Sequence, residues 1–490
     1  MSKPAPLSGF PEWLPAERLV ELEVLDTVRR VFELHGFSSL ETRAVEPLEQ
    51  LLRKGEIDKE VYVVRRLHAS DDDTDSLALH FDLTVPFARY VLQNAGHLEF
   101  PFRRYQVQKA WRGERPQEGR FREFTQADID IVGRDTLAFH HEVEVALVMA
   151  EVFRALPCPP AVILVNNRKL AEGFFLGAGA TDAGAALRAI DKIDKIGPAA
   201  VAELLENEAG LSPEGAQKCL ALAAIRSEDT SFVEQVRALG VEHPLLDEGL
   251  EQLAAVVGAA YERMPGALVA DLKIARGLDY YTGTVYETQL VGYESFGSVC
   301  SGGRYDALAS DGRTTYPGVG ISLGVSRLMG VLVGRGLVAA SRSVPTCVLV
   351  AVNDEATRGI SESVAAALRA RGISTEVAPK ADKFGKGLPP GGHKLHVDVN
   401  GRVEKSILLH RGDLLLADLV ETPTGYTFER FLFSSEFPWK RSLGAEWRLD
   451  PTHETEYTES QLRAELAESG LRLTELVTRW GEYWCVVSAA

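Results

Sequence analysis

Cysteine, long apolar runs and a leader-like N-terminus are all scarce or missing in this sequence. Its five cysteines stand singly and form no CxxC pair, which argues against a disulfide framework or a structural metal site and fits a reducing compartment. No apolar run approaches the ~20 residues that cross a bilayer. The opening MSKPAPLSGFPEW lacks the basic start and apolar core of a signal peptide. We therefore expect a cytoplasmic protein with no membrane partner and no structural metal.

Signatures of several common enzyme classes are missing as well. The chain has neither a G-x-x-x-x-G-K-[ST] phosphate loop nor an HExxH metal motif. The glycines within 318–324 do not fit G-x-G-x-x-G, and no βαβ unit surrounds them, which argues against a dinucleotide-binding site. His140 and His141, next to Glu142, are predicted to lie on a helix surface rather than to bind a metal ion.

The charge balance also limits the possible partners. Acidic residues outnumber basic ones by 70 to 53, which gives a formal net charge of −17. An acidic chain argues against a general nucleic-acid binder, because attraction to phosphates requires a basic surface. Arginines nevertheless concentrate in 102–122, so a local phosphate or RNA site remains compatible with the sequence. The length of 490 residues exceeds one compact core, and several domains are expected.

Hydrophobic periodicity outlines the first part of the chain. Apolar residues three and four apart, Leu22 and Phe32 among them, predict an amphipathic helix over 17–35. Residues 61–92 read as strands joined by a polar loop, with apolar residues alternating at 77–81. Residues 102–132 read as two long strands around a charged loop, and strands joined by a loop favour an antiparallel sheet.

The later segments complete an α+β fold, in which an antiparallel sheet is flanked by helices. An Ala/Leu-rich helical insertion occupies about 166–262, strands return at 268–291, and 318–333 reads as a strand running into a helix. After Pro345 a strand, a helix and a second strand begin a small α/β domain. The sequence thus predicts three parts: 1–335, 344–386, and an α/β tail at 387–490.

Two neighbouring stretches carry polar side chains in a pattern that suits a ligand site. Alternation along the strand 122–132 places four side chains on one face: Phe124, Gln126, Asp128 and Asp130. Arg112 and Glu114, two residues apart, point the same way if their segment is extended, so the arginine could clamp a phosphate. A solvated sheet face and a surface ion pair are the structural alternatives.

A third stretch, 275–283, places Arg276, Tyr280 and Tyr281 among glycines. Glycine suits backbone that bends sharply or approaches a ligand closely. The alternative is a turn lined by tyrosines. A fourth stretch, 318–327, ends with Arg327 on the helix that follows a glycine-containing strand.

These stretches together resemble histidyl-tRNA synthetases. AWRGERPQEGRFREFTQADIDIVG is similar to motif 2 of the class II aminoacyl-tRNA synthetases, and GVGISLGVSR is similar to motif 3. HFDLTVPFARY and ARGLDYYTGTVYE resemble the two segments that distinguish the histidine enzyme within the class. The resemblance covers about residues 12 to 386, and the HIGH and KMSKS signatures of class I are absent.

The resemblance implies a class II fold and a histidine–tRNA ligase. Such an enzyme activates L-histidine with ATP and Mg²⁺ to histidyl-adenylate and transfers it to the 3′ end of tRNA(His), as a homodimer. Arg112 and Arg276 would flank the α-phosphate as the catalytic cations. The resemblance further implies adenine contacts for Glu114 and Phe124, and β/γ-phosphate contacts for Arg120 and Arg327.

The remaining implied roles concern histidine and tRNA. Asp82, Thr84 and Gln126 would take the α-amino group of histidine. Asp130 and Tyr281 would hold the imidazole, with Tyr280 supporting them. Arg115 and Gln117 would reach the acceptor end of tRNA.

The chain departs from the family after Lys386, where the expected helix does not continue. The tail is faintly similar to the back half of a methyltransferase-type α/β fold, without the glycine-rich loop that binds S-adenosylmethionine. Two other functions therefore stay open. One is a histidine-activating paralogue that does not serve translation. The other is a non-catalytic regulatory paralogue of histidine biosynthesis.

Overall fold

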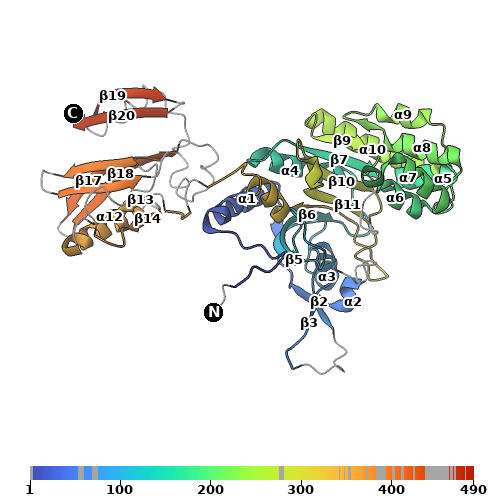
Figure 1. The fold of residues 1–490 in the computed structure, drawn as a ribbon, viewed down its shortest axis with the longest axis horizontal. Helices are drawn as coiled ribbons and strands as arrows, with labels where there is room; N and C mark the ends of the chain where they lie inside the picture. The colour runs from blue at the N-terminus through green and yellow to red at the C-terminus, as the bar shows by residue number, and fades with distance from the viewer. Residues whose placement is uncertain are drawn as a thin grey trace. The chain divides into compact units, whose positions relative to one another are not determined.

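The structure is a computed structural model of the chain (Figure 1). It describes residues 4–52, 60–68, 76–274 and 281–340, and shorter segments within 343–489. The chain divides into two compact units. Unit 1 comprises Met1–Trp13 and Val24–Ala339, and unit 2 comprises Leu14–Glu23 and Ala340–Ala490.

Unit 1 is built on a nine-stranded sheet. Neighbouring strands run antiparallel except for two parallel pairs, β1 with β5 and β7 with β9. In spatial order the strands are β1 (Ser38–Ser39), β5 (Phe102–Trp111), β6 (Glu123–Val132), β12 (Gly318–Gly324), β11 (Cys300–Tyr305), β10 (Thr284–Leu290), β7 (Ala161–Asn167), β9 (Leu268–Asp271) and β8 (Arg226–Ser227). The predicted α+β fold with an antiparallel sheet is confirmed.

The central strands of this sheet position the polar residues singled out in the sequence. β5 and β6 form the predicted long antiparallel pair, and β12 runs directly into helix α11 (Val325–Leu332), as expected. Ala127, Ile129 and Ile131 are fully buried, and α11 and α4 (His140–Ala155) pack against β6. Burial of this apolar set leaves the alternate positions of β6 for polar contacts.

A three-stranded sheet of β2 (Val45–Pro47), β4 (Leu77–Leu79) and β3 (Val63–Val64) forms a separate layer, with the short helix α2 (Leu48–Leu52) beside it. The alternation predicted for 77–81 is wrong here. Ala78 is buried against Leu51 and Phe81, whereas Leu77 is 43% exposed. The reason is that Ala78 belongs to a small apolar cluster that the sequence pattern does not reveal.

The strands predicted to continue to residue 92 are also wrong, because Thr84–Asn94 form helix α3. Asp82 lies just before this helix, and its Oδ1 accepts a hydrogen bond from the Val85 N–H at 3.2 Å. A side-chain acceptor for an otherwise unpaired N–H stabilises a helix start. This contact outweighs the β preference of the neighbouring apolar residues.

Six helices lie between β7 and β9 in the sequence and gather beside β7 and β9 (Figure 1). They are α5 (Arg168–Gly177), α6 (Ala183–Ile190), α7 (Ile193–Asn207), α8 (Pro213–Ala223), α9 (Phe232–Ala238) and α10 (Pro244–Arg263). α5 and α10 pack closely because each helix places a glycine against the backbone of the other. A Cβ on Gly249 would lie 2.1 Å from the Leu170 nitrogen, and one on Gly173 would lie 2.2 Å from the Leu246 nitrogen.

The helix predicted over 17–35 is α1 (Pro15–Leu34), and Gly36 follows it with a φ of 74°. Leu22 was expected on the buried face but is exposed, whereas Val24 and Phe32 are buried. Among the helices that the structure describes, none combines the length and apolarity that a bilayer crossing needs.

Unit 2 contains a four-stranded sheet in the order β14–β13–β16–β15 and two hairpins, β17–β18 and β19–β20. Its elements are β13 (Val348–Val350), α12 (Arg358–Ala370), β14 (Thr375–Val377), β15 (His393–Val399), β16 (Val403–Leu409), β17 (Asp413–Thr422), β18 (Gly425–Ser435), β19 (Leu471–Arg479) and β20 (Glu482–Ala489). The first strand–helix–strand matches the pattern expected within 344–386. The linker read at 387–392 lies outside the described residues.

Candidate active site

A pocket opens in unit 1 over β6, β11 and β12. Its walls come from the loop after β5, the start of β6, the residues leading into β11, and the junction of β12 with α11. The lining residues are Arg112, Glu114, Gly119, Arg120, Phe121, Phe124, Gln126, Ser298, Val299, Cys300, Ser301, Ser322, Gly324 and Arg327. The structure thus brings together all five residues expected to contact ATP. Gln126, expected to contact histidine, lines the same pocket.

Three arginines and one glutamate give the pocket a positive charge. Arg120 Nη1 lies 3.2 Å from Glu114 Oε2, and Arg112 Nη1 lies 4.0 Å from Glu114 Oε1. Arg327 donates from Nη1 to the carbonyl of Ser298 at 2.7 Å. Burial lowers the pKa of Arg327 to about 10, and repulsion from Arg120 acts in the same direction. Such a set of cations suits a polyanion, because guanidinium forks match phosphate oxygens.

Backbone contacts hold Arg112 at the pocket wall. Arg112 follows the end of β5, although the sequence suggested an extended strand there. Its N–H donates to the carbonyl of Arg122 at 2.9 Å, and its Nε donates to the carbonyl of Phe81 at 3.0 Å. Its guanidinium carbon lies 5.1 Å from the ring centroid of Phe124. The half-buried Phe124 ring therefore offers a flat apolar surface beside a cation, which suits a stacked base.

The tip of the loop is a tight turn. Gln117 and Arg120 exchange backbone hydrogen bonds of 3.1 and 2.9 Å, and Gly119 between them has a φ of 71°. Arg115 and Gln117 are exposed at this tip. Arg115 and Gln117 therefore lie where a large partner can reach them.

Asp130 lies buried on β6, two strand positions beyond Asp128. Arg104 Nη2 lies 2.6 Å from its Oδ2, and the Tyr305 hydroxyl donates to its Oδ1 at 2.8 Å. Burial raises the pKa of Asp130 to about 6, although Arg104 and Tyr305 act in the opposite direction. The carboxylate lies against Gly320 on the neighbouring strand β12, where an added Cβ would be only 2.1 Å from Oδ1. This geometry fixes one carboxylate with both oxygens already partnered.

Two other residues expected to bind histidine, Asp82 and Tyr281, lie near this carboxylate or near its partner Tyr305. Asp82, 3% exposed, precedes Thr84 at the start of α3, and its charge raises the pKa of Asp130. Tyr281 packs against Gly303, where a Cβ would lie 2.8 Å from the Tyr281 ring. Arg276 and Tyr280 lie outside the described residues, so the expected approach of Arg276 to Arg112 stays a prediction.

Several residues of the site escaped the sequence reasoning. Arg104 is fully buried and directly faces Asp130 in the β5–β6 register, while Tyr305 comes from β11. The serine and cysteine side chains of β11 and β12, Ser322 among them, also line the pocket. A correct strand register could have identified Arg104. Tyr305 stands in the segment GGRYD (302–306), and nothing in the sequence pairs it with Asp130.

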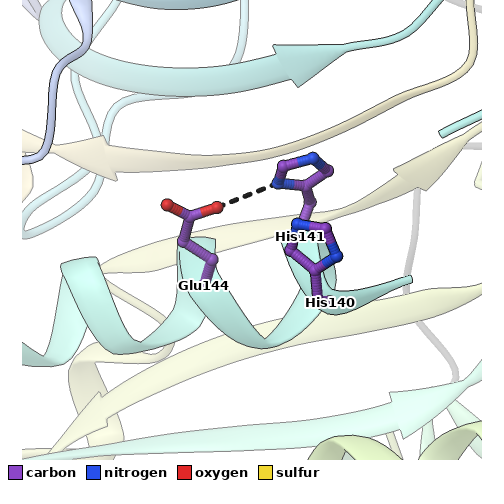
Figure 2. Close-up of side chains that lie close together, drawn as sticks. All are labelled: His140, His141 and Glu144. Carbon is purple, nitrogen blue, oxygen red and sulfur yellow. Dashed lines mark hydrogen bonds and ion pairs between the residues drawn. The ribbon is translucent and has the colours of Figure 1, made fainter. Parts of the chain in front are cut away.

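The paired histidines form a separate cluster at the start of α4 (Figure 2). The ligand-capable atoms of His140, His141 and Glu144 lie within 4.8 Å of one another. His141 Nδ1 lies 2.9 Å from one Glu144 oxygen, and Arg103 donates to the other at 2.7 Å. The surface position predicted for His141 is wrong, because its side chain is buried. Since protein groups already partner both Glu144 oxygens, the cluster does not require an ion.

The antiparallel sheet and its arginine-lined pocket define the class of protein, that of the class II aminoacyl-tRNA synthetases. The family model for histidyl-tRNA synthetase matches residues 9–328. Histidine–tRNA ligases of Cutibacterium acnes and Micrococcus luteus are 63% and 62% identical to the chain, over 79% of it and 87% of each relative. A solved histidyl-tRNA synthetase from Nostoc sp. PCC 7120 matches with a TM-score of 0.69 and 35% identity, over 79% of this chain and 88% of that one. The chain belongs to the histidyl-tRNA synthetase family, as the motifs predicted.

Proposed function

We propose that the chain is a histidine–tRNA ligase that forms histidyl-adenylate from L-histidine and ATP and then esterifies tRNA(His). One observation carries the proposal. A cationic pocket with an aromatic wall lies on the same strand as a buried, doubly partnered carboxylate. The first feature suits a nucleoside triphosphate. The second suits a side chain with an N–H donor, which an imidazole has.

In this reaction a carboxylate oxygen of histidine bonds to the α-phosphorus. The bond from that phosphorus to the oxygen that bridges to the β-phosphate breaks, and pyrophosphate leaves with its electron pair. Positioning and fixed positive charge provide most of the catalysis of such a displacement. Arg112 would stabilise the charge that develops on the α-phosphate, with Arg276 as its partner. Arg120 and Arg327 would hold the β- and γ-phosphates, and Phe124 with Glu114 would hold the adenine.

Mg²⁺ accompanies ATP in the proposal, and the residues present fit an ion of that kind. Mg²⁺ commonly binds through one or two carboxylates together with substrate phosphates. Glu287 on β10 acts electrostatically on Arg327, which lines the pocket. This carboxylate, together with the phosphates of ATP, would hold the ion. When bound, it would neutralise phosphate charge.

Asp130 would accept the imidazole N–H of histidine. Tyr305 and Arg104 hold the carboxylate in place, and each of its oxygens can still accept a second hydrogen bond. An amino acid without a donor at this point would leave that acceptor site unpaired, which costs roughly 1–3 kcal/mol. Asp82, Thr84 and Gln126 would take the α-amino group, while Tyr281, supported by Tyr280, would cover the ring.

The contacts with tRNA and the domain roles belong to the proposal as well. Arg115 and Gln117 at the exposed loop tip would reach the acceptor end. Residues 1–335 would form the catalytic domain, with a helical insertion at about 166–262. Residues 344–386 would begin an anticodon-binding-like domain, and 387–490 a divergent tail. We further propose that the protein is a cytoplasmic homodimer. A monomer in size exclusion with light scattering would contradict the dimer.

The decisive experiment is histidine-dependent ATP–pyrophosphate exchange, followed by charging of tRNA(His). We expect both activities, and we expect Arg112→Gln to abolish exchange. Arg154→Gln serves as the matched control, because Arg154 is exposed on α4 and outside the pocket lining. Exchange without charging would favour the paralogue that does not serve translation. Absence of both would favour the regulatory paralogue.

A further inference from the structure

Asp128 is a buried acid that the roles proposed above leave unused. It lies on β6 between Gln126 and Asp130, and its side chain is on their face of the strand. Its exposure is only 2%. A buried carboxylate costs stability unless other groups partner it, and Asp128 lies between β6 and the pocket-lining Ser322 that it contacts. Asp128 therefore calls for a partner.

The hydrogen bonds around Asp128 show which of its oxygens has no partner. Gln126 donates from Nε2 to Ser322 Oγ at 2.7 Å, and Asp128 also bonds the Ser322 side chain. Since the hydroxyl accepts from the amide, it can give its own hydrogen to the carboxylate. Ser322 thus orients both neighbours. Among the residues that the structure describes, the buried Gln126 Oε1 and Asp128 Oδ1 have no hydrogen-bond partner.

The charges around Asp128 point to a cation. Burial raises the pKa of Asp128 to about 7. Arg104 and the Ser322 hydroxyl lower it, whereas the neighbouring Asp130 and Asp82 raise it further. Among the described residues, Asp82, Asp128 and Asp130 thus act on one another, with Arg104 as the guanidinium that acts on Asp128 and Asp130. A positive group with several N–H donors would satisfy both the excess charge and the open oxygens.

We propose that Asp128 is an amino-acid-binding residue, whose Oδ1 accepts a hydrogen bond from the α-ammonium group of the substrate beside Gln126 Oε1. An ammonium has three N–H donors and no acceptor, so it can satisfy Gln126, Asp128 and Asp82 together. The inference rests on the proposed function, which places histidine at this end of the site. It adds a charge partner for the amine to those already proposed.

The test compares two ligands that differ only in the amine, L-histidine and 3-(imidazol-4-yl)propionate. Asp128→Asn keeps the size of the side chain and removes its charge. We expect this change to weaken histidine binding roughly 10- to 100-fold, the range for a charge-assisted hydrogen bond. Binding of imidazolylpropionate should change less than about twofold. Calorimetric titration measures both ligands on the full chain. Asp271→Asn is the matched control, because Asp271 is an equally buried strand aspartate that lies on β9, five strands away from β6 in the sheet.

Equal weakening of both ligands, or no weakening of either, would overturn the inference. In that case Asp128 would act only within the protein, for instance through a donor outside the described residues. Should Asp128→Asn fail to fold, Ser322→Ala decides in its place. It removes the hydroxyl that orients both oxygens, and the same selective loss of histidine binding is expected. If the unaltered chain bound no histidine and catalysed no exchange, the proposed function itself would fail, and the inference with it.

Discussion

Tyr305→Phe should make histidine activation depend on pH through Asp130. The substitution removes one hydroxyl, which donates to Asp130 Oδ1 at 2.8 Å in a fully buried setting. A hydrogen bond to a charged group contributes about 1.5–3 kcal/mol, or roughly one to two pKa units. Without it, the pKa of Asp130 would rise from about 6 to roughly 7–8.

The consequence for activity follows from the ionised fraction. With a pKa of about 6 the carboxyl is roughly nine-tenths ionised at pH 7, but with a pKa of 7–8 only about half to a tenth. Because the carboxylate form accepts the imidazole N–H, kcat/KM for histidine should fall about 2- to 10-fold at pH 7 and recover by about pH 9. The measurement is the rate of pyrophosphate exchange across pH 6–9. Dividing the rate of the variant by that of the unaltered chain at each pH removes the effect of the titration of histidine itself.

Stability should follow the same titration. The folded pKa of Asp130 lies above its unfolded value of 3.8, so its protonation favours the folded state, and stability falls as pH rises through the folded pKa. The Tyr305→Phe variant should therefore lose most stability above about pH 8. Tyr286→Phe is the matched control, because its buried hydroxyl donates to the carbonyl of Glu142 at 2.6 Å instead. A pH-independent loss in both variants would refute the reasoning.

Three further results are expected. Phe124→Leu should raise the KM for ATP about 2- to 10-fold, the range for one lost aromatic contact, and leave the KM for histidine nearly unchanged; an equal rise in both would contradict a base-stacking role. Gly320→Ala should abolish histidine activation, because the new methyl would lie 2.1 Å from Asp130 Oδ1 and displace it, and activity at the level of the unaltered chain would refute this. Burial pushes the pKa of Glu144 upward, but the hydrogen bonds and charges of Arg103 and His141 together lower it to about 2. Glu144→Gln should therefore lower the melting temperature at pH 7, and the difference should shrink as pH falls below 4.5.

The fold could be predicted where the residues of one element alone determine its secondary structure. The pairing of β5 with β6 and the run of β12 into α11 follow from strand alternation, a charged loop and a helical repeat. Helix α3 could not be predicted, because its start depends on a contact from Asp82 rather than on the apolar residues that follow. The buried side of β4 depends on packing against Leu51, which lies in another element.

The site divides in the same way. Alternation along one strand placed Gln126, Asp128 and Asp130 on one face without any knowledge of the fold. Arg104 could not be added, since its relation to Asp130 depends on the register between two strands. Tyr305 lies 175 positions from Asp130 along the chain, and sequence separation of that size carries no local signal.

The absence of a side chain at Gly320 limits how the amino-acid specificity of this enzyme could change. The carboxylate that would recognise the imidazole fits against β12 only because Gly320 has no Cβ, and a tyrosine from a third strand holds the carboxylate in place. Replacing the acid alone would leave an ill-fitting gap between three strands. A switch of substrate would therefore require coordinated change at positions 130, 305 and 320, which a single nucleotide substitution cannot deliver.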